Sequence, residues 1–336
     1  MPRLRRTSPD EPGWTRRRAG AGFVYLDEDG HRLNDAEAQR CKELAIPPAW
    51  KDVWITPYEN GHLQAVGTDD AGRRQYLYHS AWREKRDAEK YDRVMLFAKA
   101  LAKARAQVLE DLGCEGMSES RACAAAVRLL DLGYFRIGND VYVDEHGSFG
   151  LTTLERRHVR KQDGRLVFAF TGKSGVDHRV EIDDPGVIEA IEVMRRRRSR
   201  DDPSLLAYKN GRGWRSVLPE LVNDYVREST GLEATAKDFR TWHATVLAAA
   251  ALAETPEPGE TEASRKRAVA GAMREVASFL GNTATLARTS YVDPRVVDAY
   301  EEGRTIGAAT RRSYDNTDER QAALERATLR LLRELE

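Results

Sequence analysis

The chain contains 336 residues, and its 54 lysines and arginines balance 54 aspartates and glutamates. A hydrophobic fraction of 41% and a charged fraction of 32% are typical of a folded globular protein and exclude a disordered or fibrous chain. At roughly 150 residues per domain, the length predicts about two domains. The longest apolar run, residues 244–253, is far shorter than the ~20 residues of a membrane-spanning helix, and no apolar segment follows the basic N-terminus. We therefore expect a cytoplasmic protein with no membrane partner.

The cysteines and histidines indicate no metal site and no disulfide framework. Cys41, Cys114 and Cys123 form no CxxC pair and are odd in number, so we expect each to be a small buried residue. The seven histidines are scattered and no HExxH motif occurs, so we predict no bound metal.

Basic residues are clustered although the net charge is zero. The clusters occupy residues 16–18, 73–74, 156–161 and 195–198. One such cluster is usually a solvated face, but several together predict a groove that binds phosphate groups.

The first third of the chain has the pattern of a small antiparallel sheet. Runs rich in β-branched and aromatic residues, bounded by turn residues, predict strands at 23–26, 53–56, 62–66 and 75–78. Asn34 and Glu37 have the spacing of a capping box, which predicts a short helix that ends before Pro47 and Pro48.

From about residue 80 the apolar residues follow a helical period. One expected helix covers 122–132 and ends at Gly133, and another begins after Thr235 as its N-cap. The helix after Thr235 is expected at 236–253, and further helices are expected at 184–198, 216–229, 262–280 and 317–335. Two strands at 166–170 and 177–182 interrupt this region, around a turn with Lys173 at its tip. The fold class is therefore α+β, with a strand-rich domain over 1–90 and a larger, mostly α-helical domain over 91–336.

Two glycine-containing segments imitate nucleotide-binding loops. Gly172-Lys173-Ser174 lacks the earlier glycine of a phosphate-cradling loop, because Val167 occupies that position, and the segment joins two strands. Gly20-Ala-Gly22 lacks the third glycine of a dinucleotide site. We therefore predict no nucleotide cofactor and no other cofactor.

Five polar residues have the chemistry that phosphoryl transfer without a metal requires. Guanidinium groups such as Arg136 and Arg240 match the charge that grows on the non-bridging oxygens in the transition state. An amine such as Lys173 can protonate the leaving alkoxide, and a phenol such as Tyr291 can attack phosphorus and hold it covalently. Asn282 adds an amide donor. Each residue alone is a weak signal, so their order and local context carry the argument.

In order and context these segments resemble the type IB DNA topoisomerases, specifically the small poxvirus-like branch that also occurs in bacteria. The segments are Gln75-Tyr-Leu-Tyr78, Tyr134-Phe-Arg-Ile-Gly138, Gly150-Leu-Thr-Thr-Leu154, Gly172-Lys173, Lys237-Asp-Phe-Arg-Thr241 and Ser290-Tyr291. The resemblance implies that Tyr291 is the nucleophile that forms a 3′-phosphotyrosine, that Arg136 and Arg240 stabilise the transition state, and that Lys173 is the general acid. It also implies relaxation of supercoiled duplex DNA without ATP or an obligatory metal.

One position departs from the family pattern. Nine residues before the tyrosine, the viral enzymes carry a histidine that donates a hydrogen bond to a non-bridging oxygen, and this chain has Asn282. An amide can make the same neutral donation but cannot acquire a proton. We therefore expect activity to survive, with a changed rate and pH dependence.

The resemblance also assigns residues that contact double-stranded DNA. A strand of the N-terminal domain enters the major groove, and strand alternation puts Tyr76 and Tyr78 on one face with Gln75 and Leu77 on the other. Without the resemblance, both tyrosines would be interpreted as covering the core of the sheet. The DNA-binding residues expected in this way are Arg73, Arg74, Gln75, Tyr76, Tyr78 and Tyr142.

Two alternative functions stay open at this stage. A site-specific tyrosine recombinase shares the order of catalytic residues, but such enzymes usually have His-x-x-Arg at the second arginine, where this chain has Lys237. A DNA-binding clamp without catalysis is the other alternative, although all five candidate positions hold competent residues. We expect a monomer that acts on the DNA of the nucleoid.

Overall fold

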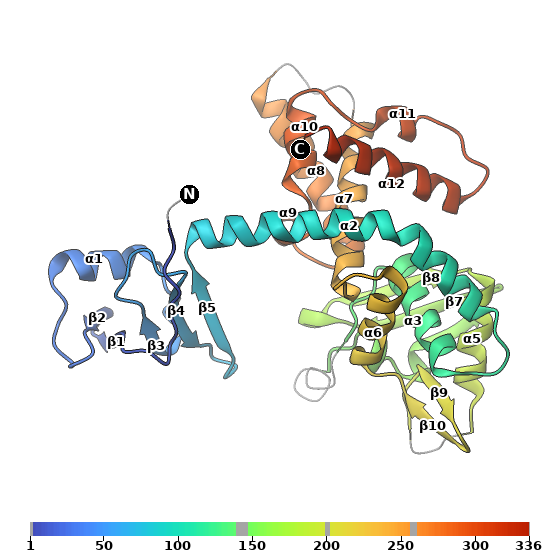
Figure 1. Cartoon of the computed structure of the whole chain (residues 1–336), viewed down its shortest axis with the longest axis horizontal. Helices are drawn as coiled ribbons and strands as arrows, with labels where there is room; N and C mark the ends of the chain where they lie inside the picture. The colour runs from blue at the N-terminus through green and yellow to red at the C-terminus, as the bar shows by residue number, and fades with distance from the viewer. Residues whose placement is uncertain (1–2, 139–146, 199–201, 256–260, 336) are drawn as a thin grey trace. The chain divides into compact units, whose positions relative to one another are not determined.

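The computed structural model of the chain describes residues 3–138, 147–198, 202–255 and 261–335. The chain divides into two compact units, Met1–Tyr91 and Asp92–Glu336, each with its own hydrophobic core. The first is rich in strands and the second is mostly helical (Figure 1), which confirms the predicted fold class. Within the described ranges, no helix combines the length and apolarity needed to cross a membrane.

The first unit contains a five-stranded antiparallel sheet with the order β2-β1-β3-β4-β5. Its elements are β1 (Trp14–Ala19), β2 (Gly22–Leu26), α1 (Asp35–Glu43), β3 (Lys51–Ile55), β4 (Leu63–Thr68) and β5 (Arg74–Tyr78). The four predicted strands are confirmed. Strand β1 was not predicted, because its run of arginines suggested a solvated surface and hid the two-residue alternation.

Helix α1 begins as the capping box predicts. The side chain of Asn34 accepts from the backbone N–H of Glu37 at 3.0 Å, and the Glu37 carboxylate accepts from the backbone N–H of Asn34 at 3.2 Å. The helix ends at Glu43, before the two prolines. On its inner face the fully buried Cys41 packs against the sheet core, so this prediction for Cys41 is confirmed.

The boundary between the two units lies inside the long helix α2 (Ser80–Leu112). The second unit continues with α3 (Glu119–Gly133), β6 (Val159–Gln162), β7 (Arg165–Thr171), η3 (Lys173–Gly175), β8 (Asp177–Ile182), α5 (Pro185–Arg196), β9 (Ala207–Asn210), β10 (Gly213–Ser216), α6 (Pro219–Thr230), α7 (Ala236–Glu254), α8 (Glu262–Leu280), α9 (Ala284–Ser290), α10 (Pro294–Glu301), α11 (Gly307–Thr310) and α12 (Thr317–Arg333). Two short 3₁₀ turns, η1 (Leu151–Thr153) and η2 (Arg156–His158), precede β6.

The predicted helices of the second unit are confirmed to within a few residues. Strands β6, β7 and β8 form an antiparallel sheet, and β9 pairs with β10 in a separate hairpin. Neither β6 nor this hairpin was predicted, because each of these strands has only four residues and little periodicity shows over that length. Helix α7 is almost entirely buried and packs against α3, α8 and α10–α12 (Figure 1).

A buried ionic network joins four helices of this unit. Asp131 on α3 accepts from Arg105 on α2 at 2.7 and 2.8 Å, and it lies 3.1 Å from Nε2 of His243 on α7. Arg105 also donates to Glu325 on α12 at 2.7 and 2.9 Å. Burial by itself would raise the pKa of Asp131, but hydrogen bonds from Arg105 and His243 bring it well below its usual range.

The remaining two cysteines differ in exposure. Cys123 is buried in α3 as expected. The prediction for Cys114 is wrong, since it is exposed in the turn that follows α2, where the chain leaves the helix and no second layer covers it.

Candidate active site

Four of the five side chains singled out for phosphoryl transfer lie together in the second unit. Arg136 follows α3 and donates from Nη2 to the Asn282 side-chain oxygen and, at 3.2 Å, to the backbone carbonyl of Gly281. The guanidinium carbon of Arg240, on α7, lies 5.5 Å from the ring centroid of Tyr291, at the end of α9. The structure therefore gathers two cations, an amide and a phenol from segments that are up to 155 residues apart, from 136 to 291.

A tight turn holds the segment that carries Arg136. Tyr134 caps α3 in the left-handed conformation with φ 55°, and the Arg136 carbonyl accepts from the N–H of Leu151 at 2.8 Å. A Cβ atom at Gly150 would lie 2.4 Å from the Cα of Gly138, so only glycine permits this close approach of the two backbones. The segment that begins at Gly150 thus holds the chain at Arg136 and at the two residues that follow it.

Arg240 is fixed by two backbone carbonyls. Its side chain is 5% exposed, and it donates to the carbonyl of Tyr134 and, at 2.7 Å, to that of Leu280. Burial first, and then the positive charge of Arg136, lower the pKa of Arg240 to about 10. The group is still a cation at neutral pH, and it is already oriented by bonds that do not need a substrate.

Asn282 follows the left-handed Gly281 at the end of α8. Its oxygen accepts from Arg136, whereas its buried amide nitrogen has no hydrogen-bond partner within the described residues. An unpaired buried donor costs about 1–3 kcal/mol, so it is expected where a ligand will supply the acceptor. This amide is the donor that the family resemblance directs at a phosphate oxygen.

The backbone at Tyr291 is tied to helix α7. The hydroxyl of Thr245 lies 3.4 Å from the Tyr291 carbonyl and accepts from the N–H of Asp293 at 3.1 Å. Asp293 in turn caps α10 through its side chain. The tyrosine therefore stands at a fixed junction between α9 and α10, and its backbone is tied to the helix that carries Arg240.

The electrostatic surroundings favour the ionised form of the phenol. Burial by itself would raise the pKa of Tyr291, but the charges of Arg240 and Arg136, a hydrogen bond from Arg240 and the charge of Lys237 lower it below the usual value. A lowered pKa makes a better nucleophile at neutral pH. The contribution of Lys237 was not predicted, although its position one helical turn before Arg240 was a usable signal.

Lys173 lies on the turn between β7 and β8, next to Gly172. It is exposed, and the turn is closed by the N–H of Gly172, which donates to the carbonyl of Val176 at 2.7 Å. Gly172 lines the same hollow as Arg136 and Arg240. The predicted hairpin is confirmed, and the general-acid role of Lys173 stays a prediction.

The hollow at this cluster is small, with a volume of about 30 Å³. Sites for small molecules usually measure about 300–1,000 Å³. The cluster is thus suited to one group presented at the surface by a large substrate. His178 lines the hollow as well, a residue that was not predicted because a single histidine on a strand is an ambiguous signal.

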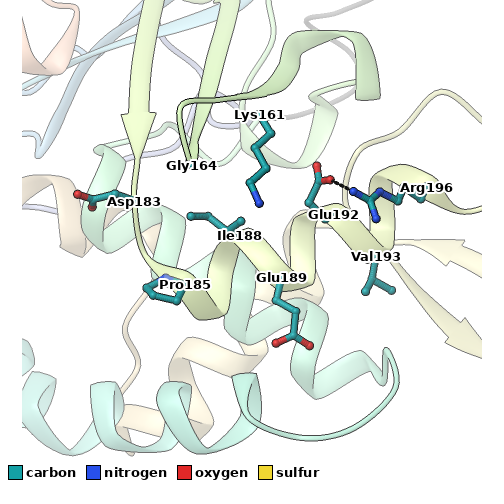
Figure 2. Close-up of a pocket in the computed structure, with 9 residues that line it drawn as sticks. All are labelled: Lys161, Gly164, Asp183, Pro185, Ile188, Glu189, Glu192, Val193 and Arg196. Atoms are coloured by element: carbon teal, nitrogen blue, oxygen red, sulfur yellow. Dashed lines mark hydrogen bonds and ion pairs between the residues drawn. The ribbon is translucent and has the colours of Figure 1, made fainter.

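A larger hollow of about 560 Å³ lies between β6, the turn that follows it and α5 (Figure 2). It shares no lining residue with the cluster around Arg136. Lys161 and Ile188 contribute to its wall, and Glu192 is already paired with Arg196 at 2.6 Å, as the dashed line in Figure 2 marks. Because charged side chains of its lining are already paired, this hollow indicates no particular ligand.

Most of the expected DNA-contacting residues lie at one edge of the sheet in the first unit. Tyr76 is 48% exposed and stacks with Tyr78 at a centroid distance of 6.2 Å, while Leu77 packs on the core, so the alternation along β5 is confirmed. Asp69 accepts from Arg73 at 3.0 Å and from Gln75 at 2.9 Å.

Arg74 is also exposed at the start of this strand. Tyr142 lies outside the described residues, so its predicted role is not examined by the structure.

Three of the basic clusters each contain an arginine that binds groups of the protein itself. Arg16 donates to three backbone carbonyls of the first unit, including that of Ile46 at 2.9 Å. Arg197 is 5% exposed and pairs with Asp202 at 2.9 Å, and Arg156 bonds the carbonyl of Asp202 at 2.8 Å. These three arginines stabilise loops, and the groove expected from the four clusters stays a prediction. Among the residues that the structure describes, no three His, Cys, Asp or Glu side chains gather as a metal site would require.

Comparisons with known proteins identify the family of this chain. Residues 79–313 match the family described as the catalytic core of eukaryotic DNA topoisomerase I, and residues 22–69 match the N-terminal domain of bacterial DNA topoisomerase IB. A mimivirus DNA topoisomerase 1B is 27% identical over 297 residues, which cover 86% of this chain and 88% of the relative. A vaccinia virus DNA topoisomerase 1B is 28% identical over 144 residues, or 41% of this chain and 45% of the relative.

A DNA topoisomerase 1 of Mycosarcoma maydis is 26% identical over 274 residues, which cover 76% of this chain and 26% of that longer protein. The family model covers more than half of the chain, and the resemblance drawn from the motifs is confirmed. The chain therefore belongs to the type IB DNA topoisomerase family and is an enzyme of the isomerase class.

Proposed function

We propose that the protein relaxes supercoiled duplex DNA by cutting one strand, allowing the free end to rotate, and resealing the strand. The observation that carries the proposal is the cluster in which Arg136, Arg240 and Asn282 surround the phenol of Tyr291. Three hydrogen-bond donors and one nucleophile beside a narrow hollow are the groups that phosphoryl transfer at a single phosphodiester requires.

In the proposed step the oxygen of Tyr291 attacks the phosphorus and forms a phosphotyrosine at the 3′ end of the strand. The bond from phosphorus to the 5′ oxygen breaks, and the leaving oxygen takes a proton from Lys173. The proton of the phenol is lost beforehand, which the lowered pKa of Tyr291 favours. Resealing is the same sequence in reverse, with the 5′ hydroxyl as nucleophile.

The arginines and the amide are proposed to stabilise negative charge in the transition state. Negative charge grows on the two non-bridging oxygens as the phosphorus becomes five-coordinate, and guanidinium groups held in a low-dielectric site stabilise it. Arg240 is bound to two carbonyls before substrate arrives, which reduces the reorganisation needed in the reaction. The unpaired amide nitrogen of Asn282 supplies a further donor.

No ATP is needed in this scheme, because one phosphodiester is exchanged for another and the bond energy is kept in the covalent intermediate. The strain of the supercoiled DNA drives the reaction toward relaxed DNA. The side chains provide the positive charge at phosphorus, so we propose that a divalent metal is dispensable.

We further propose that the two units are two domains, a DNA clamp over residues 1–90 and a catalytic domain over 91–336. In the clamp, the exposed Tyr76 and Tyr78 on β5 contact DNA together with Gln75, and Arg73 and Arg74 bind phosphates whatever the base sequence. The protein is proposed to act as a monomer on nucleoid DNA, where supercoiling arises.

A plasmid relaxation assay tests the function. Supercoiled plasmid is incubated with the protein in EDTA and without nucleotide, and the products are separated by electrophoresis. We expect a ladder of partly relaxed topoisomers. Joined or exchanged DNA molecules would instead favour a site-specific recombinase, and retardation without relaxation would favour a clamp that has no catalytic activity.

A further inference from the structure

We propose that His178 is a positioning residue that holds the turn carrying Lys173 in its working place. The inference deepens the proposed function and rests on it, because it concerns proton donation to the leaving 5′ oxygen. Nothing in the family resemblance assigns a role to this histidine.

The imidazole of His178 lies against the base of the turn. His178 is the second residue of β8, and its ring stacks on that of Phe170 with centroids 5.1 Å apart and an angle of 19° between the planes. A Cβ atom at Gly172 would lie 2.7 Å from both Cδ2 and Nε2 of the imidazole. The ring is therefore in direct contact with the backbone of the residue that precedes Lys173.

The same ring also meets the end of α8. A Cβ atom at Gly281 would lie 2.3 Å from Cε1 of His178. Gly281 stands between Leu280, whose carbonyl holds Arg240, and Asn282. His178 thus fills the space between the turn and the segment that carries the anion-binding groups.

The two glycines are explained in different ways. Gly281 has φ +60°, a conformation that favours glycine whatever surrounds it. Gly172 has φ −97° and ψ −167°, which any residue can adopt, so its backbone gives no reason for glycine. The contact with the ring of His178 supplies that reason, since a side chain there would displace either the imidazole or the turn.

Displacement of the turn would act directly on Lys173. The turn is exposed, and Ser174 at its tip has φ 65°, in the left-handed region. The N–H of Gly175 donates to the carbonyl of Gly172 at 3.1 Å, and the hydroxyl of Thr171 donates to the carboxylate of Asp177 at 2.8 Å. The ring of His178 packs against the base that these bonds close. A misplacement of about 1 Å can cost about 10²-fold in rate when a reacting group is involved.

The charge state of the ring suits a packing role. Burial first, then the charges of Arg136 and Arg240, lower the pKa of His178, while Asp177 has the opposite effect. The ring is thus neutral at pH 7 and can stay in contact with two backbone segments beside two cations.

The test compares two DNA substrates in single-turnover cleavage at a site mapped with the wild-type protein. One has the normal 5′ oxygen and the other a 5′-bridging sulfur, whose thiolate leaves without a proton. We expect His178→Ala to slow cleavage of the oxygen substrate about tenfold or more and to change cleavage of the sulfur substrate less than about threefold. Equal slowing of both substrates would overturn the inference. Glu181→Ala, on the same strand but the opposite face, is the matched control and should leave both rates unchanged.

A second variant keeps the test independent of any loss of stability in the first. Gly172→Ala introduces the Cβ atom that collides with the ring, so it should also slow the oxygen substrate selectively. In the His178→Ala background the collision is removed, and Gly172→Ala should add less than about twofold because the two residues are coupled. If the double variant slowed cleavage by the product of the two single-variant factors, the inference would be contradicted. Failure of the wild-type protein to cleave either substrate would instead contradict the proposed function.

Discussion

Asp131 permits a quantitative test of how the second unit supports its site. The carboxylate is 4% exposed and binds Arg105 through two hydrogen bonds, and Nε2 of the buried His243 lies 3.1 Å away. His243 is one helical turn after Arg240, and its ring meets that of Tyr134 edge to face at 5.0 Å. Asp131 therefore supports both the helix that carries Arg240 and the residue whose carbonyl holds it.

Asp131→Asn removes the charge without changing the shape of the side chain. Breaking a buried ion pair from one side costs about 3–5 kcal/mol. Arg105 keeps its two bonds to Glu325, so we expect the free energy of unfolding to fall by about 3 kcal/mol, the lower end of that range. The measurement is urea unfolding followed by circular dichroism at a helical wavelength, which reports mainly on the second unit.

Asp318→Asn is a matched control, since Asp318 and Asp131 each have a carboxylate oxygen 3.5 Å from Arg128. The side chain of Asp318 is 74% exposed, so its loss should cost less than about 1 kcal/mol. Equal unfolding midpoints for the two variants would refute the assignment of the buried network as a support.

The stabilising contribution of Asp131 to the folded protein changes with pH in a definite direction. The folded-state pKa of Asp131 is lowered, so its stabilising contribution is present above the unfolded value near 4 and is lost as the pH falls toward the folded value. The stability difference between the wild type and Asp131→Asn should therefore narrow below about pH 4. A difference that stayed constant from pH 7 to pH 3 would contradict a charged Asp131 in the folded protein.

Three further predictions concern the site and the DNA interface. Arg240→Gln should raise the pKa of the Tyr291 phenol, because it removes a cation that lowers it; ultraviolet difference titration against Tyr291→Phe measures this pKa, and an unchanged value would contradict the electrostatic account. Asn282→Ala should slow single-turnover cleavage by about 10²-fold through loss of one donor, whereas Asn282→His should retain most of the rate; equal rates for both variants would exclude donation by this residue. Arg74→Ala should weaken DNA binding equally across sequences and reduce the slope of log K against log salt by about 0.9, as measured by titration at several salt concentrations; an unchanged slope would exclude a phosphate contact.

Local signals predicted much of the fold. The capping pair Asn34 and Glu37, the helix stop at Gly133 and the cap at Thr235 each act within a few residues, and the structure has all three. Strand β1 and the hairpin of β9 and β10 were missed, because an arginine run or a length of four residues hides the alternation. Exposure at Cys114 also depends on tertiary context, which a single residue in a sequence does not report.

The candidate site was only partly predictable for the same reason. Motif order identified the residue types, and their roles stay predictions. The supports of the site are backbone groups that no residue identity reveals, such as the Tyr134 carbonyl that accepts from Arg240 across 106 residues of sequence. The contact of His178 with Gly172 and Gly281 likewise arises only when β8 and α8 meet in space.

The most direct measurement identifies the residue that becomes attached to DNA. Relaxation of a supercoiled plasmid is stopped with detergent, the DNA is digested with nuclease, and the peptide that carries a nucleotide is identified by mass spectrometry. We predict that the nucleotide is on Tyr291, and that Tyr291→Phe binds DNA with nearly unchanged affinity but yields no adduct. An adduct on another residue, or one that persists in Tyr291→Phe, would contradict the proposal that the phenol between Arg136 and Arg240 is the nucleophile.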